Sequence, residues 1–245
     1  MKQILITGGM SGLWKQMAFI AQWKWYAVDI LDISAWETSE SELLENMRFI
    51  QGDICKIDEK FLEKLSWNYD IVICNAGISL SGNFIDHSSV ENTRLMNINT
   101  LWHIELIRIL LENKIINKKW SIGCIASASE KLPFPIALWY AASKWALRAF
   151  AVSLRSYLIG QKISVSIVYP WPMPTAHVKY YGKQVTDNEK TQRKVLNIAQ
   201  KTFRGIEKGK RNIYPDMVSK MILLAAPFQW ILDRVMYKAY KKEIS

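Results

Sequence analysis

Tyr140 and Lys144 are four residues apart in a stretch, residues 137–158, that has helical composition and contains no Gly or Pro. Residues at this spacing lie on the same face of a helix. An ammonium beside a phenol favours the phenolate and lowers its pKa, so the tyrosine would donate and accept protons nearer neutral pH. A tyrosine and a lysine on an ordinary surface helix have the same spacing, so the pair alone does not establish a proton-transfer site.

The N-terminal segment contains a second candidate site, a glycine-rich turn formed by Gly8, Gly9 and Gly12. The turn follows an apolar run, residues 4–6, which predicts a buried strand, and precedes a predicted helix over residues 15–22. Backbone N–H groups and the positive end of the helix dipole would bind a pyrophosphate here. Glycine would let the backbone approach that group closely. A glycine turn without a ligand is the alternative.

Together with four further motifs, these residues resemble the short-chain dehydrogenase/reductase family in its classical form, over residues 1–175. Residues 7–14 match its TGxxxGxG turn except at the last position, Trp14, and residues 75–77 match its NAG motif. Tyr140 and Lys144 match the YxxxK pair. Further positions correspond to the catalytic serine, the catalytic asparagine and the PGxxxT segment after the sixth strand: Ser127, Asn99, and the pair Pro170 and Thr175. A set of motifs that occurs in this order is highly specific.

The resemblance implies an oxidoreductase that interconverts an alcohol and a carbonyl by hydride transfer with NAD or NADP. Tyr140 would be the general acid or base, and Ser127 would hydrogen-bond the substrate oxygen. Lys144 would bind the nicotinamide ribose and lower the tyrosine pKa, and Asn99 would hold a water in the proton relay. Structural hydrogen bonding is the alternative role for Ser127 and Asn99 taken singly. The partner would be a small-molecule alcohol or carbonyl substrate, whose identity the residues do not indicate.

NAD is favoured over NADP because the family pattern, taken without gaps, brings the end of the second strand to Asp32. A carboxylate there accepts hydrogen bonds from the ribose 2′-hydroxyl and repels a 2′-phosphate. Asp29 is the rival if the preceding helix is shorter, and Asp53 matches the family's adenine-binding aspartate. NADP stays possible. The predicted cofactor-binding residues are Gly8, Met10, Ser11, Gly12, Leu13, Asp32, Asp53, Ile54, Asn75, Ala76, Gly77, Tyr140, Lys144, Pro170 and Thr175.

These residues need a scaffold, and the chain predicts an α/β fold: a Rossmann-like, doubly wound parallel sheet with helices on both faces. Apolar runs at residues 71–74, 122–125 and 165–168 predict later strands, separated by helical stretches. The site would lie at the carboxyl ends of the strands. We expect a single domain, residues 1–245, with a nucleotide-binding and catalytic core over 1–175 and a substrate-lid and C-terminal helical segment over 176–245. Substrate specificity should reside in residues 78–87, 128–139 and 171–190.

The chain has a formal net charge of +10, with its basic residues concentrated toward the C-terminal third. A solvated cationic surface is the first interpretation. Apolar residues at 221–228 and 231–232, followed by a basic tail, suggest a weak contact with an anionic membrane surface as a second. Packing against a partner subunit explains the same stretch, and a homodimer or homotetramer is expected. Nucleic acid is not, because no recognition motif accompanies the basic residues.

The cysteines Cys55, Cys74 and Cys124 form no close metal-type cluster, which predicts reduced core residues in a cytoplasmic protein. The three histidines lack paired ligand spacing, so no metal site is predicted. We expect neither a signal peptide nor a membrane span, because no apolar run approaches about 20 residues.

Tryptophan occupies positions 14, 25, 102, 120 and 171, where the family commonly has glycine. The chain has 11 Trp and 11 Gly, where average usage gives about 17 Gly. In one explanation the indoles at Trp14 and Trp171 crowd the cofactor, and the chain is a catalytically impaired scaffold or regulatory relative. In the other, UGA codons that specify glycine were decoded as tryptophan. We favour the second, because drift should not choose tryptophan repeatedly; UGG codons at all five positions would exclude it.

Overall fold

The computed structural model describes residues 1–8, 12–33, 46–57, 59–65, 68–132, 134–171 and 189–244. Its strands are β1 (Lys2–Thr7), β2 (Tyr26–Asp32), β3 (Met47–Gln51), β4 (Tyr69–Cys74), β5 (Ile116–Ile125), β6 (Ser164–Val168) and β7 (Asn212–Ile213). Its α-helices are α1 (Gly12–Trp23), α2 (Glu59–Leu62), α3 (Ser89–Met96), α4 (Trp102–Glu112), α5 (Leu138–Tyr157), α6 (Glu189–Glu207), α7 (Met217–Ala225) and α8 (Gln229–Ile244). Short helical turns, η2 to η5 and η7, lie at Phe84–Asp86, Asn97–Leu101, Ala128–Lys131, Ile159–Gln161 and Ala226–Phe228.

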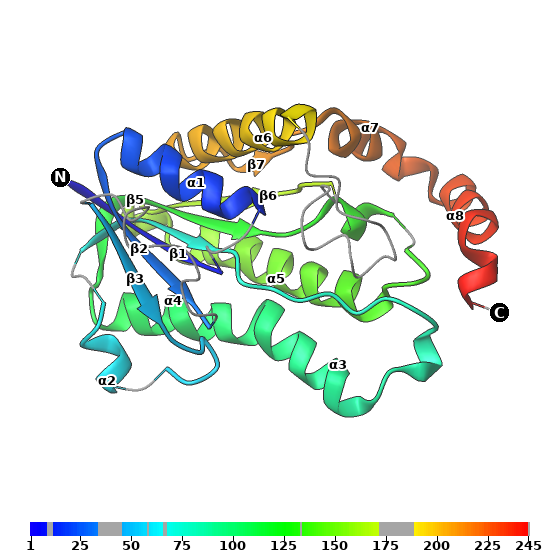
Figure 1. Ribbon diagram of the computed structural model, residues 1–245, viewed down its shortest axis with the longest axis horizontal. Helices are drawn as coiled ribbons and strands as arrows, with labels where there is room; N and C mark the ends of the chain where they lie inside the picture. Colours follow the sequence, from blue (N-terminus) through cyan, green and yellow to red (C-terminus); the bar gives the residue numbers. More distant parts are fainter. Residues whose placement is uncertain are drawn as a thin grey trace.

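All strands pair in parallel in one seven-stranded sheet of order β3-β2-β1-β4-β5-β6-β7 (Figure 1). The order runs outward in one direction from β1 and in the other from β4, which is the doubly wound topology predicted from the sequence. Ligands in such sheets bind at the carboxyl ends of the strands where the order reverses. The carboxyl ends of β1 and β4 are therefore the place to look for a site.

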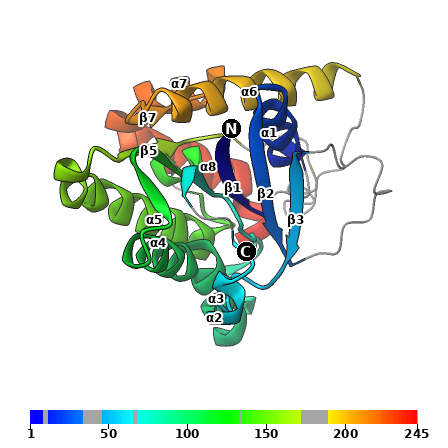
Figure 2. The same ribbon diagram turned by 90° about the vertical axis from the view of Figure 1, so that its left-hand side faces the viewer.

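Helices cover both faces of the sheet, as Figure 2 shows. On one face, α1 and α6 bury apolar side chains such as Met17 and Phe203 against Ile4 and Ile6 of β1. On the other face, α4 and α5 pack against the intervening residue Leu5 and against the alternate residues of β4 and β5. Successive strand residues point to opposite faces, so one apolar strand supplies both cores.

The predicted elements lie close to the observed ones. The helix predicted over residues 137–158 is α5, and the apolar runs at 71–74, 122–125 and 165–168 lie within β4, β5 and β6. The first helix begins at Gly12 instead of the predicted Lys15, so Trp14 lies in its first turn. The short edge strands β3 and β7 lack a comparable apolar run, so their bounds were not predicted.

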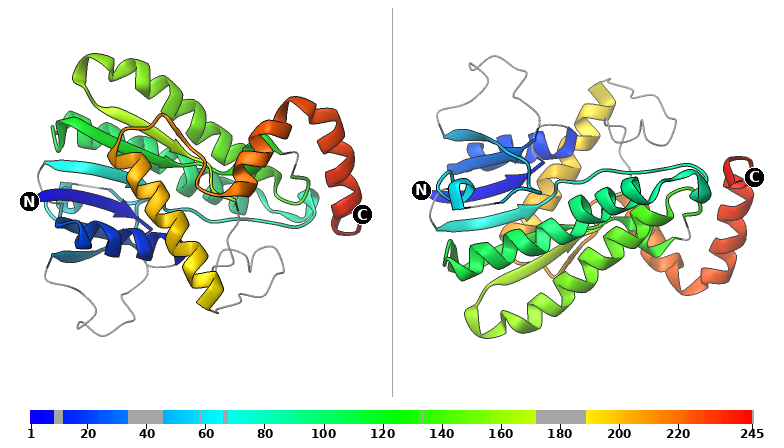
Figure 3. Two further views of the ribbon diagram at one scale, coloured as in Figure 1. Left: turned by 90° about the horizontal axis from the view of Figure 1, so that it is seen from above. Right: turned by 90° about the horizontal axis from the view of Figure 1, so that it is seen from below.

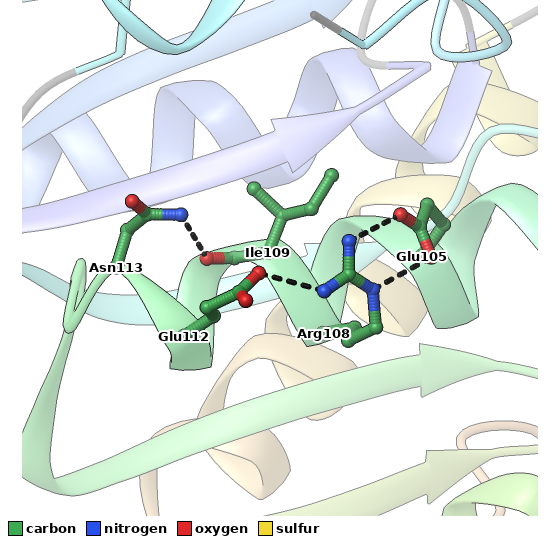
Figure 4. Close-up of polar contacts among 5 residues, drawn as sticks. All are labelled: Glu105, Arg108, Ile109, Glu112 and Asn113. Carbon is green, nitrogen blue, oxygen red and sulfur yellow. Dashed lines mark hydrogen bonds and ion pairs between the residues drawn. The ribbon is translucent and has the colours of Figure 1, made fainter. Parts of the chain in front are cut away.

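Helix α4 has a charged outer face that belongs to the scaffold. Arg108 is hydrogen-bonded and ion-paired to Glu105 and Glu112, one turn away on either side, and the side chain of Asn113 donates to the carbonyl of Ile109 at the helix end (Figure 4). The pKa of Glu105 is lowered by its hydrogen bonds with Arg108. Exposed pairs at this spacing support a helix only weakly.

The C-terminal helices α7 and α8 lie at the end of the molecule away from the N-terminus (Figure 3). No helix within the described ranges is long and apolar enough to cross a membrane. Among these same residues, no group of three or more His, Cys, Asp or Glu side chains could hold a metal ion.

Candidate active site

The turn after β1 is fixed to the segment after β4 by buried hydrogen bonds. The backbone N–H groups of Asn75 and Ala76 both donate to Thr7 Oγ1, at 2.9 and 3.1 Å. The Asn75 side chain in turn donates to the carbonyls of Thr7 and Gly8, at 2.9 and 2.8 Å. Thr7 is fully buried. Thr7 and Gly8 of the first motif and Asn75 and Ala76 of the second therefore form one structural unit.

Gly8 shows why this unit requires glycine. Its φ is +68°, and a Cβ on it would lie 2.7 Å from the Cα of Ala76. A side chain would thus be strained by the backbone conformation and would clash with a main chain that cannot move independently. The close approach of the two segments depends on glycine at position 8.

Asn99 lies in the π-helical turn between α3 and α4, and its side chain is completely buried. Its Oδ1 accepts from the N–H of Ile78 at 2.8 Å, and its Nδ2 donates to the carbonyl of the same residue at 2.9 Å. The second Nδ2 hydrogen goes to Ser143 Oγ on α5 at 3.0 Å, and Ser143 Oγ donates to the carbonyl of Tyr140 at 2.7 Å. Asn99 thereby joins the segment after β4 to the helix that bears Tyr140.

Lys144 is the second connection between α5 and the sheet. Its Nζ donates to the carbonyl of Ile125, the last residue of β5, at 3.0 Å. The same Nζ lies 5.8 Å from the ring centroid of Tyr140. Burial lowers the pKa of Lys144 to about 8, while the neighbouring Cys124 and Cys74 act in the opposite direction. An ammonium in this position favours the phenolate form of the tyrosine.

Gly77 is the point at which these side chains converge. A Cβ on Gly77 would lie 3.1 Å from Asn99 Oδ1 and 3.3 Å from Lys144 Nζ. Gly77 is itself exposed, whereas Asn99, Lys144 and Tyr140 are buried. Polar side chains from two separate elements, the π-helical turn and α5, therefore meet beneath an exposed glycine at the carboxyl edge of the sheet.

Ser127 follows β5 and begins the turn Ala128–Lys131. Its Oγ accepts two hydrogen bonds from Ser129, one from the backbone N–H at 3.1 Å and one from the hydroxyl at 2.7 Å. The N–H of Ala128 donates to the carbonyl of Pro170, which follows β6, at 3.0 Å. A serine hydroxyl has two acceptor positions and one hydrogen. With both acceptor positions used, Ser127 is set up to donate.

A cavity of about 530 Å³ lies beside the carboxyl ends of β2 and β3. Ile33, which follows Asp32 at the end of β2, and Asp53 both line it. Asp53 also fixes its own loop, because its Oδ1 accepts from the N–H of Cys55 at 2.9 Å. The remaining lining residues come from the loop after β3, from α3, from η3 and from the first residue of α4: Cys55, Ser89, Val90, Thr93, Arg94, Asn97, Ile98 and Trp102.

Asp29, the rival to Asp32, has a different role. It lies within β2, is buried, and forms a bidentate pair with Arg48 of β3 at 2.9 and 2.6 Å. Tyr69 of β4 also donates to it. These contacts occupy the carboxylate inside the sheet, so Asp32 is the aspartate at the strand end.

The remaining predicted cofactor residues divide into two groups. Gly12 and Leu13 lie in the first turn of α1, where the Leu13 side chain is buried in the core, and Ile54 is buried beside Asp53. Met10, Ser11 and Thr175 lie outside the described residues.

Two of the five tryptophans at family glycine positions fit poorly. Trp25 has a φ of +62°, a conformation that favours glycine, and 76% of its surface is exposed. Trp120 is half-buried, and its indole Nε1 finds no hydrogen-bond partner within the described chain. Trp102 lines the cavity beside Asp53. Trp171 is half-buried, and its backbone N–H donates to Asp216 Oδ2 at 3.1 Å.

Sequence reasoning missed two buried ionisable residues near the site. His103 Nε2 donates to the carbonyl of Ala76, 2.7 Å away, and burial lowers the pKa of His103 to about 4, so the neutral ring is favoured. Glu130, three residues after Ser127, has a buried carboxylate 3.2 Å from Arg148 Nε of α5. Burial raises the pKa of Glu130 to about 7 despite the nearby cations Lys131 and Arg148. No spacing pattern marks either residue, because each acts through a contact distant in sequence.

Comparison with known proteins places these observations in a family. The model of the family described as short chain dehydrogenase matches residues 2–186. The chain is 31% identical over 230 residues to 11-beta-hydroxysteroid dehydrogenase-like 3 of Arabidopsis thaliana, which covers 86% of this chain and 72% of that protein. It is 30% identical over 152 residues to dehydrogenase/reductase SDR family member 7B of Rattus norvegicus, covering 59% of this chain and 46% of that protein. The chain therefore spans less than half the length of the second relative.

Solved structures share the fold. A short chain dehydrogenase/reductase from Burkholderia phymatum in complex with NAD is similar with a TM-score of 0.76 and 17% identity, over 92% of each chain. ElxO with NADP bound is similar with a TM-score of 0.73 and 20% identity, over 90% of this chain and 99% of that chain. These likenesses confirm the predicted Rossmann-like architecture.

Proposed function

Because the chain belongs to the short-chain dehydrogenase family, we propose that it interconverts an alcohol and a carbonyl, with Tyr140 as the proton donor and acceptor and NAD as the favoured cofactor. The observation that carries the proposal is the convergence of Asn99 and Lys144 beneath Gly77, with Lys144 Nζ 5.8 Å from the ring centroid of Tyr140. In the same proposal, residues 1–175 form the catalytic core and 176–245 the substrate-lid and C-terminal segment. A homodimer or homotetramer and a cytoplasmic location complete it.

The residues present fit a nicotinamide dinucleotide. The cavity beside Ile33 and Asp53 has room for an adenosine group, and Asp32 at the end of β2 would bind its ribose. The amino end of α1, next to Gly8, would hold the pyrophosphate. Lys144 would donate to the nicotinamide ribose. When bound, the cofactor supplies or accepts the hydride.

The chain's own residues would handle the proton. Tyr140 would donate its hydroxyl proton to the carbonyl oxygen during reduction, and Lys144 would stabilise the resulting phenolate through its charge. Ser127, whose acceptor positions are both used by Ser129, would donate to the same oxygen and stabilise the charge that develops on it. Both functions require a dry pocket, which the burial of Tyr140 and Ser127 supports.

Asn99 would act mainly by position. Both Nδ2 hydrogens are used, for Ile78 and Ser143, and Oδ1 accepts from Ile78. The side chain thus holds the π-helical turn, and Asn99 would also hold a relay water there. Loss of the side chain would displace both the segment at Gly77 and the helix that bears Tyr140.

The central test separates cofactor binding from chemistry. NADH is titrated into the protein by fluorescence, and NADH oxidation is then followed with a panel of aliphatic and aromatic ketones and aldehydes. Tyr140→Phe should bind NADH as the unmodified chain does and lose turnover by about 10²-fold or more. Tyr157→Phe, on the exposed end of the same helix, is the matched control and should change neither quantity. Full turnover in Tyr140→Phe would rule out the proposed role.

Cofactor preference has its own variant. Asp32→Ala removes the carboxylate that would bind the ribose 2′-hydroxyl, so NADH should bind less tightly and NADPH more tightly. Asp86→Ala changes an exposed aspartate elsewhere and should leave the ratio unchanged. An unchanged ratio in Asp32→Ala would contradict the preference for NAD.

A catalytically impaired scaffold or regulatory protein is the second candidate function. Trp102 in the cavity wall and the half-buried Trp171 after β6 favour it, because indoles there take space that glycine would leave. This candidate predicts no NADH binding by the chain as printed. Binding should then appear in Trp14→Gly with Trp171→Gly, and tight binding without these changes would exclude it.

A further inference from the structure

The C-terminal arm, residues Met217–Ile244, consists of α7, the turn Ala226–Phe228 and α8. One face of α8 packs inward. Met236 and Tyr240, four residues apart, contact the apolar cluster that contains Phe134, Ile136 and Tyr140. The rings of Tyr240 and Phe134 meet edge to face, with centroids 5.3 Å apart. The arm is therefore anchored beside the proposed catalytic tyrosine.

The other faces of the arm expose large apolar side chains. On α7 and the following turn, Met217, Met221, Leu224 and Phe228 recur at helical spacing and are all more than half exposed. A soluble surface usually scatters such residues singly, and a cluster marks an interaction site. The exposed large apolar residues of the arm are Met217, Val218, Met221, Leu223, Leu224, Phe228, Trp230, Ile231, Val235 and Tyr237.

The same arm is basic. Lys220 on α7 and Arg234, Lys238 and Lys241 on α8 are exposed. The acidic residues of the arm, Asp233 and Glu243, are fewer than its basic ones. Arg234, Lys238 and Lys241 lie on the face of α8 opposite Met236 and Tyr240, since they are displaced by about half a helical turn from that stripe.

Charge decides between the occupants that an apolar surface admits. Two copies of this arm would bring like charges together, which disfavours self-association through it. An anionic lipid surface complements both features, since apolar side chains enter the boundary of the acyl region and lysines and arginines bind the headgroups. We propose that the C-terminal arm is a docking surface for anionic membranes, through which lipophilic substrates reach the cluster beside Tyr140.

The docking part of this proposal is independent of catalysis, and only the statement on substrates rests on the proposed function. The test is sedimentation of the full-length protein with phosphatidylcholine vesicles that contain phosphatidylserine, at low salt. Binding should be strong to these vesicles, weak to pure phosphatidylcholine, and reduced by added salt. Equal binding to neutral vesicles would overturn the proposal.

The test variant reverses the charge at three exposed lysines of the arm by combining Lys220→Glu, Lys238→Glu and Lys241→Glu. At roughly fivefold per charge near an anionic surface, vesicle affinity should fall at least about 100-fold. The matched control reverses three exposed lysines elsewhere, Lys64, Lys114 and Lys162, and should retain most of the binding. An equal loss in the control would show that total charge, and not the arm, is responsible.

Two further measurements keep the outcomes distinct. Sedimentation velocity reports the oligomeric state, and a change of state in the arm variant with unaltered vesicle binding would assign the surface to a second copy instead. NADH titration of the arm variant should match that of the unmodified chain, because the substituted lysines lie outside the proposed cofactor site. Failure of vesicle binding with normal NADH binding would overturn the docking proposal and leave the oxidoreductase proposal standing.

Discussion

Trp25 offers a test of whether the backbone conformation at position 25 favours glycine over tryptophan. The residue has a φ of +62° in the turn between α1 and β2 and exposes 76% of its surface, so its indole contributes little packing. A side chain in the left-handed region is disfavoured by about 1 to 2 kcal/mol. Replacing tryptophan by glycine would remove this cost, but the greater entropy of the unfolded chain would offset about 0.4 to 1 kcal/mol of it. Trp25→Gly should therefore raise the free energy of unfolding by about 0.5 to 1 kcal/mol.

Trp23 provides the matched control, because it is a tryptophan two residues away that exposes 81% of its surface but lies in α1. Trp23 is the last residue of α1, where glycine still costs backbone entropy, so Trp23→Gly should lower the free energy of unfolding by up to about 0.5 kcal/mol. For a chain of this size, each kcal/mol shifts Tm by about 2 to 4 °C, which calorimetry resolves. If both variants lose stability to the same extent, the backbone argument is refuted.

Three further outcomes test the site. Thr7→Val keeps the side-chain shape but leaves the N–H groups of Asn75 and Ala76 without their acceptor, so urea unfolding should show a loss of about 2 to 4 kcal/mol. The control Thr202→Val removes a buried hydroxyl that has no hydrogen-bond partner within the described chain, and should be neutral or stabilising. An equal loss of stability in both variants would contradict the acceptor role of Thr7. Lys144→Met should weaken NADH binding roughly tenfold, because one hydrogen bond to the cofactor is lost. Lys162→Met, on an exposed turn, is the control and should leave NADH binding unchanged. Unchanged NADH binding by Lys144→Met would exclude the proposed contact with the ribose. Burial raises the pKa of Glu130 to about 7, so the folded state favours its protonated form. The resulting contribution to stability is fully present below pH of about 4.5 and is lost as the pH rises through 7. The difference in unfolding free energy between the unmodified chain and Glu130→Gln should therefore change by up to about 3 kcal/mol between low and neutral pH. A difference that stays constant with pH would contradict the effect of burial.

The sequence was most informative where one local pattern fixes one element. The apolar runs at 71–74 and 165–168 predicted strands because a fully buried parallel strand has no polar face, and the stretch at 137–158 predicted α5 because nothing in it interrupts a helix. The family motifs placed Asn99, Ser127 and Lys144 at the carboxyl edge of the sheet. The edge strand β7 has two residues, too few for any periodic pattern.

Contacts between segments distant in sequence could not be predicted in this way. Glu130 looks like a surface residue, since glutamate is seldom fully buried unless paired. Its burial follows from Arg148, which approaches from α5 only after the sheet has formed. The bond between His103 and the carbonyl of Ala76 similarly depends on how α4 packs against the end of β4. Such residues carry no local signal because their partners are defined by the tertiary structure.

The proposed catalytic geometry is built from contacts within the chain itself. Lys144 is hydrogen-bonded to Ile125, Asn99 to Ile78 and Ser143, and Ser127 to Ser129. Preformed hydrogen bonds of this kind spare the reorganisation that catalysis would otherwise require. Tryptophan near the cofactor would therefore act on binding of the dinucleotide more than on this arrangement. If the indoles at these two positions are native, we therefore expect the chain to fold stably but not to bind NADH. NADH binding should then appear once Trp14 and Trp171 are changed to glycine.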